Sequence, residues 1–230
     1  KTMQEQAHWR LSTFYFFYFT VLGTMVPYLP LYLKSLHLTA WHIGVLTSVM
    51  AGTKIIAPNI WGWLADHSGR RMLVIRVGCI LAVLPFLWLL RGDHSLLSLA
   101  VIIFCYSFFW NAVLAQFEAV TLAHLGKKAE RYSRIRLWGS IGFIVAVASF
   151  GWLFDRISIA FFPMVVTFAL LAIFLSSCVV RDPERHIAHG HSASNTTSFW
   201  QQLYHPSVAI FFCVCFLMVL SHGAYYTFFS

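Results

Sequence analysis

The chain carries little charge. Only 10% of its 230 residues are Asp, Glu, Lys or Arg and 59% are hydrophobic, whereas about 25% of the residues in a soluble globular domain are charged. A core formed by a chain of this length is too small to hide so much apolar surface from water. The composition therefore excludes an ordinary soluble domain and favours a protein whose surface faces lipid.

Other absences exclude other classes of protein. The sequence contains no P-loop pattern, so a nucleotide-driven machine of that kind is not indicated. Its five cysteines lie within apolar runs and lack the spacing of zinc ligands or of a disulfide framework, so we expect no metal or other cofactor. The net charge of +8 does not indicate nucleic-acid binding, because the basic residues fall in short clusters between apolar runs.

Long apolar runs dominate the sequence. A helix needs about 20 residues to cross the hydrocarbon core of a membrane, and these runs lack the polar alternation of spanning strands. Seven runs are long enough, or nearly so: Leu11–Leu33, Trp41–Ala65, Met72–Leu90, Leu96–Leu125, Ile135–Phe154, Ile159–Val180 and Val208–Ser230. The sequence therefore predicts an all-α, polytopic transmembrane helix bundle.

The basic residues predict the orientation of this bundle. If the N-terminus lies inside, the inner segments hold twelve of the 16 Lys and Arg residues, the outer loops hold three, and Lys54 lies within the second run. Inner loops of membrane proteins are enriched in Lys and Arg. We therefore expect a multi-pass protein of the cell (inner) membrane with a cytoplasmic N-terminus.

The runs also predict three parts along the chain. Residues 1–180 form a bundle of six helices, residues 181–206 form a polar cytoplasmic linker, and residues 207–230 begin a seventh helix that the chain leaves unfinished. Six helices, a long inner linker and a further helix match the first half of a 6 + 6 transporter built from two related halves.

A loop motif connects the second and third runs: Gly62-Trp-Leu-Ala-Asp66-His-Ser-Gly69-Arg70-Arg71. Gly69 can take a positive φ without strain, and Asp66 can accept hydrogen bonds from free amides or from Arg70. An ordinary inner loop with a turn glycine would also explain these residues.

This loop resembles the signature between helices two and three of the major facilitator superfamily. The resemblance implies two six-helix bundles around a central substrate cavity. It also implies that the loop forms part of a cytoplasmic gate, with Asp66 and Arg70 coupling the gate to conformational change.

A second motif, Arg134-Ile-Arg136-Leu-Trp-Gly139-Ser140-Ile-Gly142, resembles the fifth helix of the lactose permease-like branch and, more closely, of the phenylpropionate permease group. The resemblance implies that Glu118 and Arg136 bind substrate, because their separation matches that of the glutamate and arginine that hold sugar in lactose permease. Phe143 stands where lactose permease stacks a tryptophan on the sugar, and a phenyl ring suits an aromatic or apolar substrate better.

Spacing alone brings the same pair together. Glu118 and Arg136 are each nine residues from Lys127, near the turn of a predicted hairpin, so they should lie at similar depth. An ion pair there would lower the cost of holding either charge in low dielectric. The pair could equally be a structural salt bridge near the cytoplasmic interface.

Two further polar residues are candidates for the cavity. A lysine in the middle of a spanning helix costs roughly 2.5–3.5 kcal/mol, so Lys54 should face an interior or aqueous path, where it could balance an anionic substrate. It could instead snorkel or pair with a carboxylate outside this chain. Asn111 could line the cavity or only bond a neighbouring helix.

The leading functional interpretation is a secondary transporter that moves a small organic solute, such as an aromatic or other carboxylate, by alternating access. Proton coupling is implied by the resemblance, and we expect a monomer whose partners are its substrate, protons and the lipid bilayer, with no nucleic acid. A sugar or nucleoside proton symporter of the same superfamily is the alternative. A membrane-embedded transferase would need a convergent catalytic set, and Asp66 beside His67 is the one adjacent pair.

Overall fold

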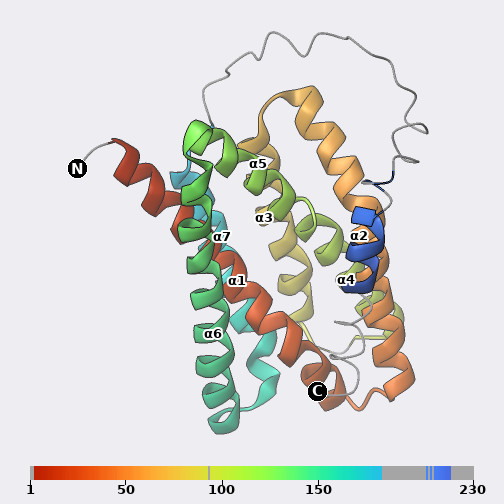
Figure 1. The fold of residues 1–230 in the computed structure, drawn as a ribbon. Coiled ribbons are helices and arrows are strands. Elements are labelled where there is room, and N and C mark those ends of the chain that lie inside the picture. Colours follow the sequence, from red (N-terminus) through yellow and green to blue (C-terminus); the bar gives the residue numbers. More distant parts are fainter. Residues whose placement is uncertain (1–2, 93, 183–205, 207, 209, 219–230) are drawn as a thin grey trace. The chain divides into compact units, whose positions relative to one another are not determined.

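The computed structural model of the chain describes residues 3–92, 94–182, 206, 208 and 210–218 (Figure 1). The chain divides into two compact units, residues 1–184 and residues 185–230. In the second unit, residues 210–218 are helical. The predicted linker and the predicted seventh helix lie largely outside the described residues, so the three-part division stays a prediction.

Every regular element described in the first unit is a helix, as the sequence predicts. The elements are α1 (Met3–Ser35), α2 (Ala40–Ser68), α3 (Arg71–Leu89), α4 (Leu96–Trp110), α5 (Val113–Leu125), the 3₁₀ turn η1 (Gly126–Arg131), α6 (Tyr132–Arg156), the 3₁₀ turn η2 (Ile159–Phe161) and α7 (Phe162–Val179). Within the described residues, six stretches are long and apolar enough to cross a membrane, with α4 and α5 together forming one of them.

Local sequence signals fix several helix ends. Thr39 precedes α2 and its hydroxyl accepts a hydrogen bond from His42 N, while Ser95 accepts one from Ser98 N at the start of α4. These side chains satisfy amide groups that have no partner inside the first turn of a helix. At the other end of α2, Gly69 takes φ 61° and donates its N–H to Ala65 O, which ends the helix in a left-handed turn.

The helices pack in characteristic pairs: α1 with α6, α2 with α4, and α3 with both α4 and α7. Figure 1 shows α6 running alongside α1 on one side of the bundle. Small residues allow the α1–α6 approach, because a Cβ atom on Gly142 would lie 3.0 Å from Phe16 Cα and one on Gly23 would lie 2.8 Å from Phe143 O. Gly142 and Gly23 therefore permit close contact between α1 and α6.

Aromatic rings fill the core beside this contact. Tyr18 of α1 stacks on Trp110 of α4 with ring centroids 4.4 Å apart, and Phe14 stacks on Phe117 of α5 at 3.6 Å. All four side chains are buried. Helix α1 therefore contacts α4 and α5 on both sides of the point where they meet.

The predicted run Leu96–Leu125 is confirmed as one spanning stretch, but at that meeting point it divides into two helices. The helix is interrupted at Asn111 and Ala112, where Ala112 N donates to Phe109 O, three residues back, at 3.2 Å. Neither proline nor glycine occupies the interruption, so local sequence did not indicate it. Side chains from α2 bond to this region, as described below.

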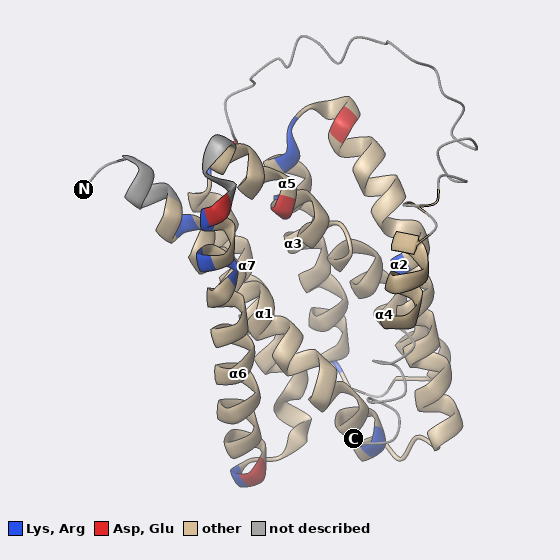
Figure 2. Ribbon diagram, viewed as in Figure 1, with Lys and Arg blue, Asp and Glu red and all other residues tan. Residues whose placement is uncertain are grey.

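The charges lie mainly at the ends of the bundle. Figure 2 shows most of the described charged residues gathered at the end that carries the α2–α3 connection and η1. Fewer charged residues occupy the opposite end, which carries the α1–α2, α3–α4 and α6–α7 connections. This separation leaves an apolar band between the two ends of the bundle, as a membrane-spanning protein requires.

Candidate functional site

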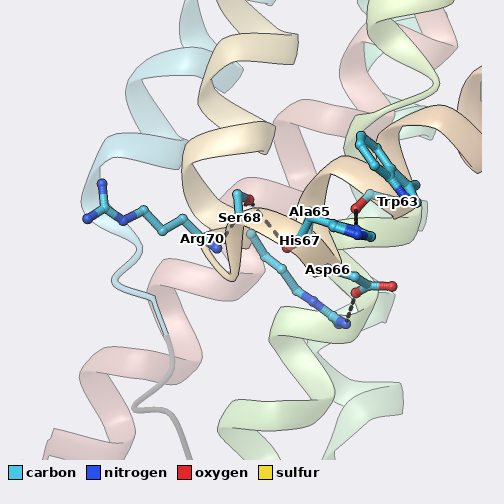
Figure 3. Close-up of polar contacts among 7 residues, drawn as sticks. Trp63, Ala65, Asp66, His67, Ser68 and Arg70 are labelled. Carbon is cyan, nitrogen blue, oxygen red and sulfur yellow. Dashed lines mark hydrogen bonds and ion pairs between the residues drawn. The ribbon is translucent and has the colours of Figure 1, made fainter.

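The loop motif forms a compact turn that one ion pair holds (Figure 3). Arg71 Nη2 lies 2.9 Å from Asp66 Oδ1. No other ion pair forms among the described residues. The side chains of Arg71 and Asp66 are 40% and 65% exposed. An ion pair this exposed contributes at most about 1 kcal/mol to stability.

Of the partners predicted for Asp66, free amides or Arg70, Arg70 is wrong, because Arg71 forms the ion pair. Arg70 precedes α3 with φ −123° and ψ 72°, and its side chain points away from Asp66 (Figure 3). Its amide donates to Ser68 Oγ at 3.4 Å. Arg70 thus leaves its guanidinium directed outward, available to contacts beyond this bundle.

The structure requires glycine at one of the two loop-motif positions, Gly69, and not at the other, Gly62. Gly69 needs its positive φ of 61°, which confirms the predicted turn. A Cβ atom on Gly62 would lie 3.7 Å from Gln116 Nε2, an ordinary contact, so nothing described in the bundle requires glycine there.

His67 does not interact with Asp66. Its Nδ1 lies 3.1 Å from Trp63 O and its ring lies over Trp63 at 4.2 Å, as Figure 3 shows. The adjacent acid and histidine that a transferase would need therefore have separate partners. The loop therefore does not bring the two residues together as a catalytic pair.

A second contact closes the same end of the bundle, between α3 and α7. Arg76 of α3 donates to Val180 O at 2.7 Å and to Ser177 O at 3.3 Å, while Asp182 Oδ1 accepts from Met72 N at 2.9 Å. The guanidinium satisfies carbonyls at the end of α7 and the carboxylate caps the start of α3. We name these residues the α3–α7 clasp.

Glu118 of α5 and Arg136 of α6 do not form the predicted ion pair in the described structure. Tyr132 Oη instead donates to Glu118 Oε1 at 3.4 Å. Arg136 lies over the ring of Phe19, with Cζ 3.9 Å from the centroid, and 5.6 Å from the centroid of Tyr15. Both charged side chains are half-buried.

The physical reason for this difference is the close contact between α1 and α6. A Cβ atom on Gly139 would lie 2.6 Å from Phe19 Cδ2, so the glycine lets the Phe19 ring press against α6 beside Arg136. A cation over an aromatic face gains about 0.5–2 kcal/mol, more when desolvated. Phe143, one turn further along α6, is half-buried, and its carbonyl faces Gly23 of α1.

Asn111 joins a polar cluster between α2 and α4. Its Nδ2 donates to Thr53 Oγ1 at 3.1 Å and to Ser107 Oγ at 3.3 Å. Both hydroxyls bond to Met50 O, at 2.8 Å and 3.2 Å. Asn111 therefore bonds a neighbouring helix, and its role toward a substrate remains a prediction.

Lys54 directly follows Thr53 of this polar cluster but lies on the exposed face of α2. The Lys54 ammonium group forms no ion pair with another described residue. Its two neighbours on the C-terminal side, Ile55 and Ile56, are also exposed, at 75% and 59%. The surroundings of Lys54 thus differ from those of Glu118 and Arg136, and its role toward a substrate stays a prediction.

Sequence reasoning missed the aromatic and hydroxyl partners of these residues. Phe19 and Ser107 bear on the site through contacts between helices far apart in the chain, and Tyr132 through a bond between the consecutive helices α6 and α5. A signal for Ser107 existed, since a hydroxyl four residues before Asn111 lies on the same helix face. For Phe19 no comparable signal existed among the many aromatic residues of α1.

Comparisons with known proteins place the chain in a family. The sequence pattern of the family described as MFS_1 like family matches residues 8–230. The chain is 30% identical to a maltose permease of Geobacillus stearothermophilus over 160 residues, which are 69% of this chain and 40% of that protein. It is 25% identical to a probable 3-phenylpropionic acid transporter of Escherichia coli (strain K12) over 229 residues, or 97% of this chain and 58% of that protein.

A third relative is the quinolone resistance protein NorA of Staphylococcus aureus (strain MRSA252), 28% identical over 178 residues, or 76% of this chain and 45% of that protein. No solved structure matches the chain with comparable significance. The chain spans about half the length of the curated relatives it matches. These relatives are named as permeases, transporters and resistance proteins and not as enzymes. With its helical bundle and its loop motif, the chain belongs to the MFS_1 like family of the major facilitator superfamily of membrane transporters.

Proposed function

We propose that the full-length protein is a secondary active transporter that moves a small organic solute across the cell membrane by alternating access. Family membership and the six spanning stretches support this proposal. The exposed ion pair between Asp66 and Arg71 suits a gate, because its rupture costs little. We place this gate in the cytoplasm, together with the N-terminus, because most Lys and Arg residues gather at that end.

The solute that the geometry supports best is a carboxylate, preferably an aromatic one. The observation that carries this proposal is Arg136, a half-buried cation that lies over Phe19 and has no carboxylate within ion-pair distance among the described residues. A substrate carboxylate would supply that charge through charge-assisted hydrogen bonds. Lys54 adds a second cation within a spanning stretch, and an aromatic substituent could pack against nearby rings.

A second candidate is a sugar, because one relative is named a maltose permease. Glu118 is half-buried and accepts a bond from Tyr132, and such a carboxylate could equally accept bonds from sugar hydroxyls. Proton coupling and a monomeric state are proposed from the family resemblance.

Uptake by the full-length protein in proteoliposomes tests this function. Under an imposed proton gradient we expect accumulation of a labelled aromatic carboxylate, and collapse of the gradient by an ionophore should abolish it. Maltose in a parallel assay tests the second candidate. Solute accumulation that requires ATP and ignores the gradient would contradict secondary transport. The 230-residue chain alone should not transport, because it spans about half the length of its relatives.

A further inference from the structure

The interruption between α4 and α5 leaves one backbone carbonyl without its usual helical partner. In an uninterrupted helix Ala112 N would donate to Phe108 O, but here it donates to Phe109 O at 3.2 Å. In the hydrocarbon core lipid cannot satisfy such a group, so a spanning helix can be interrupted only where protein groups or the water of a cavity replace the lost bond.

Trp61 of α2 replaces that bond. Its Nε1 donates to Phe108 O at 3.0 Å across a separation of 47 residues. The Trp61 side chain is 7% exposed, and its ring packs against Phe108 and Phe109 with centroids 5.8 and 6.0 Å away. A residue of α2 therefore completes the backbone bonding of the fourth spanning stretch.

The same interruption is enclosed from α3. A Cβ atom on Gly78 would lie 3.2 Å from Phe109 O and 3.2 Å from Ala112 Cβ, so α3 has no side chain where the α4–α5 junction passes. The junction is thus held between the indole on α2 and the glycine on α3. These are independent contacts on the segment from Phe108 to Ala112.

Trp61 also lies on the same face of α2 as Ala65 of the loop motif. The buried positions of α2 recur every four residues at Thr53, Ala57, Trp61 and Ala65. Ala65 O accepts the Gly69 N–H that forms the turn, and Thr53 bonds Asn111 at the interruption. One face of α2 therefore connects the gate turn to the junction from which α5, with Glu118, begins.

We propose that Trp61 is a positioning residue that latches the α4–α5 junction to α2, so that movement of the gate turn is transmitted to α5 and Glu118. This inference rests on the proposed transport function. It gives the indole N–H a role beyond packing, since the ring alone would fill the same space. Loss of the N–H should free the junction while the fold remains.

Trp61→Phe in the full-length protein tests this proposal, because it keeps an aromatic ring and removes the N–H. Trp63→Phe is the matched control, since Trp63 lies two residues away and is 61% exposed. Hydrogen–deuterium exchange of peptides that cover residues 108–114 should rise about tenfold in Trp61→Phe, as expected for loss of one buried hydrogen bond, and should not change in the control. In uptake assays, the turnover rate of Trp61→Phe should fall about tenfold while KM stays within about twofold.

Gly78→Ala provides a second route to the junction if Trp61→Phe fails to fold. Its added methyl group would press on Phe109 and Ala112, so exchange over residues 108–114 should rise there too. Unchanged exchange in Trp61→Phe, or faster exchange with unchanged turnover, would overturn the proposal. The exchange measurement does not depend on transport, so failure of the wild-type protein to transport any solute would refute the proposed function separately.

Discussion

Arg136 lies over the ring of Phe19 at 3.9 Å and not against Glu118. A guanidinium that is paired with a ring keeps its charge, whereas one that is paired with a carboxylate is neutralised. We propose that this relationship leaves the positive charge of Arg136 available to an anionic solute. It also means that Glu118 and Arg136 should behave as independent residues.

A double-mutant cycle tests that independence. We expect Glu118→Gln, Arg136→Leu and the double variant to give additive changes in the free energy of unfolding, with a coupling energy below about 0.5 kcal/mol. Thermal or denaturant unfolding of the purified variants measures these free energies, and the coupling energy follows from their differences. A coupling energy of 1 kcal/mol or more would show that the two residues form the ion pair that spacing alone suggests.

The loop motif yields a prediction about which arginine matters. Asp66→Asn and Arg71→Gln remove the same exposed ion pair, so each should slow transport turnover to a similar extent and change stability by less than about 1 kcal/mol. Substrate affinity should be almost unchanged, because the loop lies at the end of the bundle. Arg70→Gln is the comparison variant, because it leaves the ion pair between Asp66 and Arg71 in place. If Asp66→Asn abolished binding while turnover stayed normal, the loop would not be a gate.

The α3–α7 clasp should contribute to stability. Arg76→Met removes the guanidinium donor from Val180 O and from Ser177 O, which keeps the Val180 N–H. We expect a loss of about 1–3 kcal/mol in the free energy of unfolding. Arg91→Met, at an exposed position in the α3–α4 connection, should change it by less than about 0.5 kcal/mol. Equal effects of the two substitutions on the melting temperature would argue against the clasp.

Close packing of α1 on α6 predicts a glycine requirement. In Gly142→Ala the new methyl group would overlap the backbone of Phe16, so the free energy of unfolding should fall by about 1–3 kcal/mol. Gly44→Ala is the matched control, because a Cβ atom there meets nothing within 4 Å of the described residues. Its higher helix propensity should leave stability unchanged or raise it by up to about 1 kcal/mol. A stable Gly142→Ala variant would show that the two helices can separate freely.

Much of the fold follows from the sequence because apolar run length and basic loops are strong local signals. The predicted run Trp41–Ala65 lies within α2, and Met72–Leu90 matches α3 to within one residue at each end. The left-handed turn at Gly69 was predictable for the same reason, since glycine tolerates positive φ.

The parts that could not be predicted depend on contacts between distant helices. At the interruption after Trp110, the indole of Trp61 and the hydroxyl of Thr53 from α2 bond the chain, and no residue at Asn111 or Ala112 breaks a helix by itself. The choice of Phe19 over Glu118 as the partner of Arg136 depends on how closely α1 approaches Gly139. Spacing along a hairpin sets depth in the membrane but not the direction in which a side chain turns.

The most direct measurement of the central claim compares the binding of 3-phenylpropionate with that of its neutral amide by the full-length protein. A charge-assisted bond worth roughly 1.5–3 kcal/mol predicts that the carboxylate binds about ten- to a hundred-fold more tightly in isothermal titration calorimetry. Lys54→Met and Arg136→Leu should each reduce the ratio of the affinity for the carboxylate to that for the amide, whereas Trp63→Phe should leave this ratio unchanged. Equal affinities for the carboxylate and the amide in the wild-type protein would contradict the account of an anion-binding cavity.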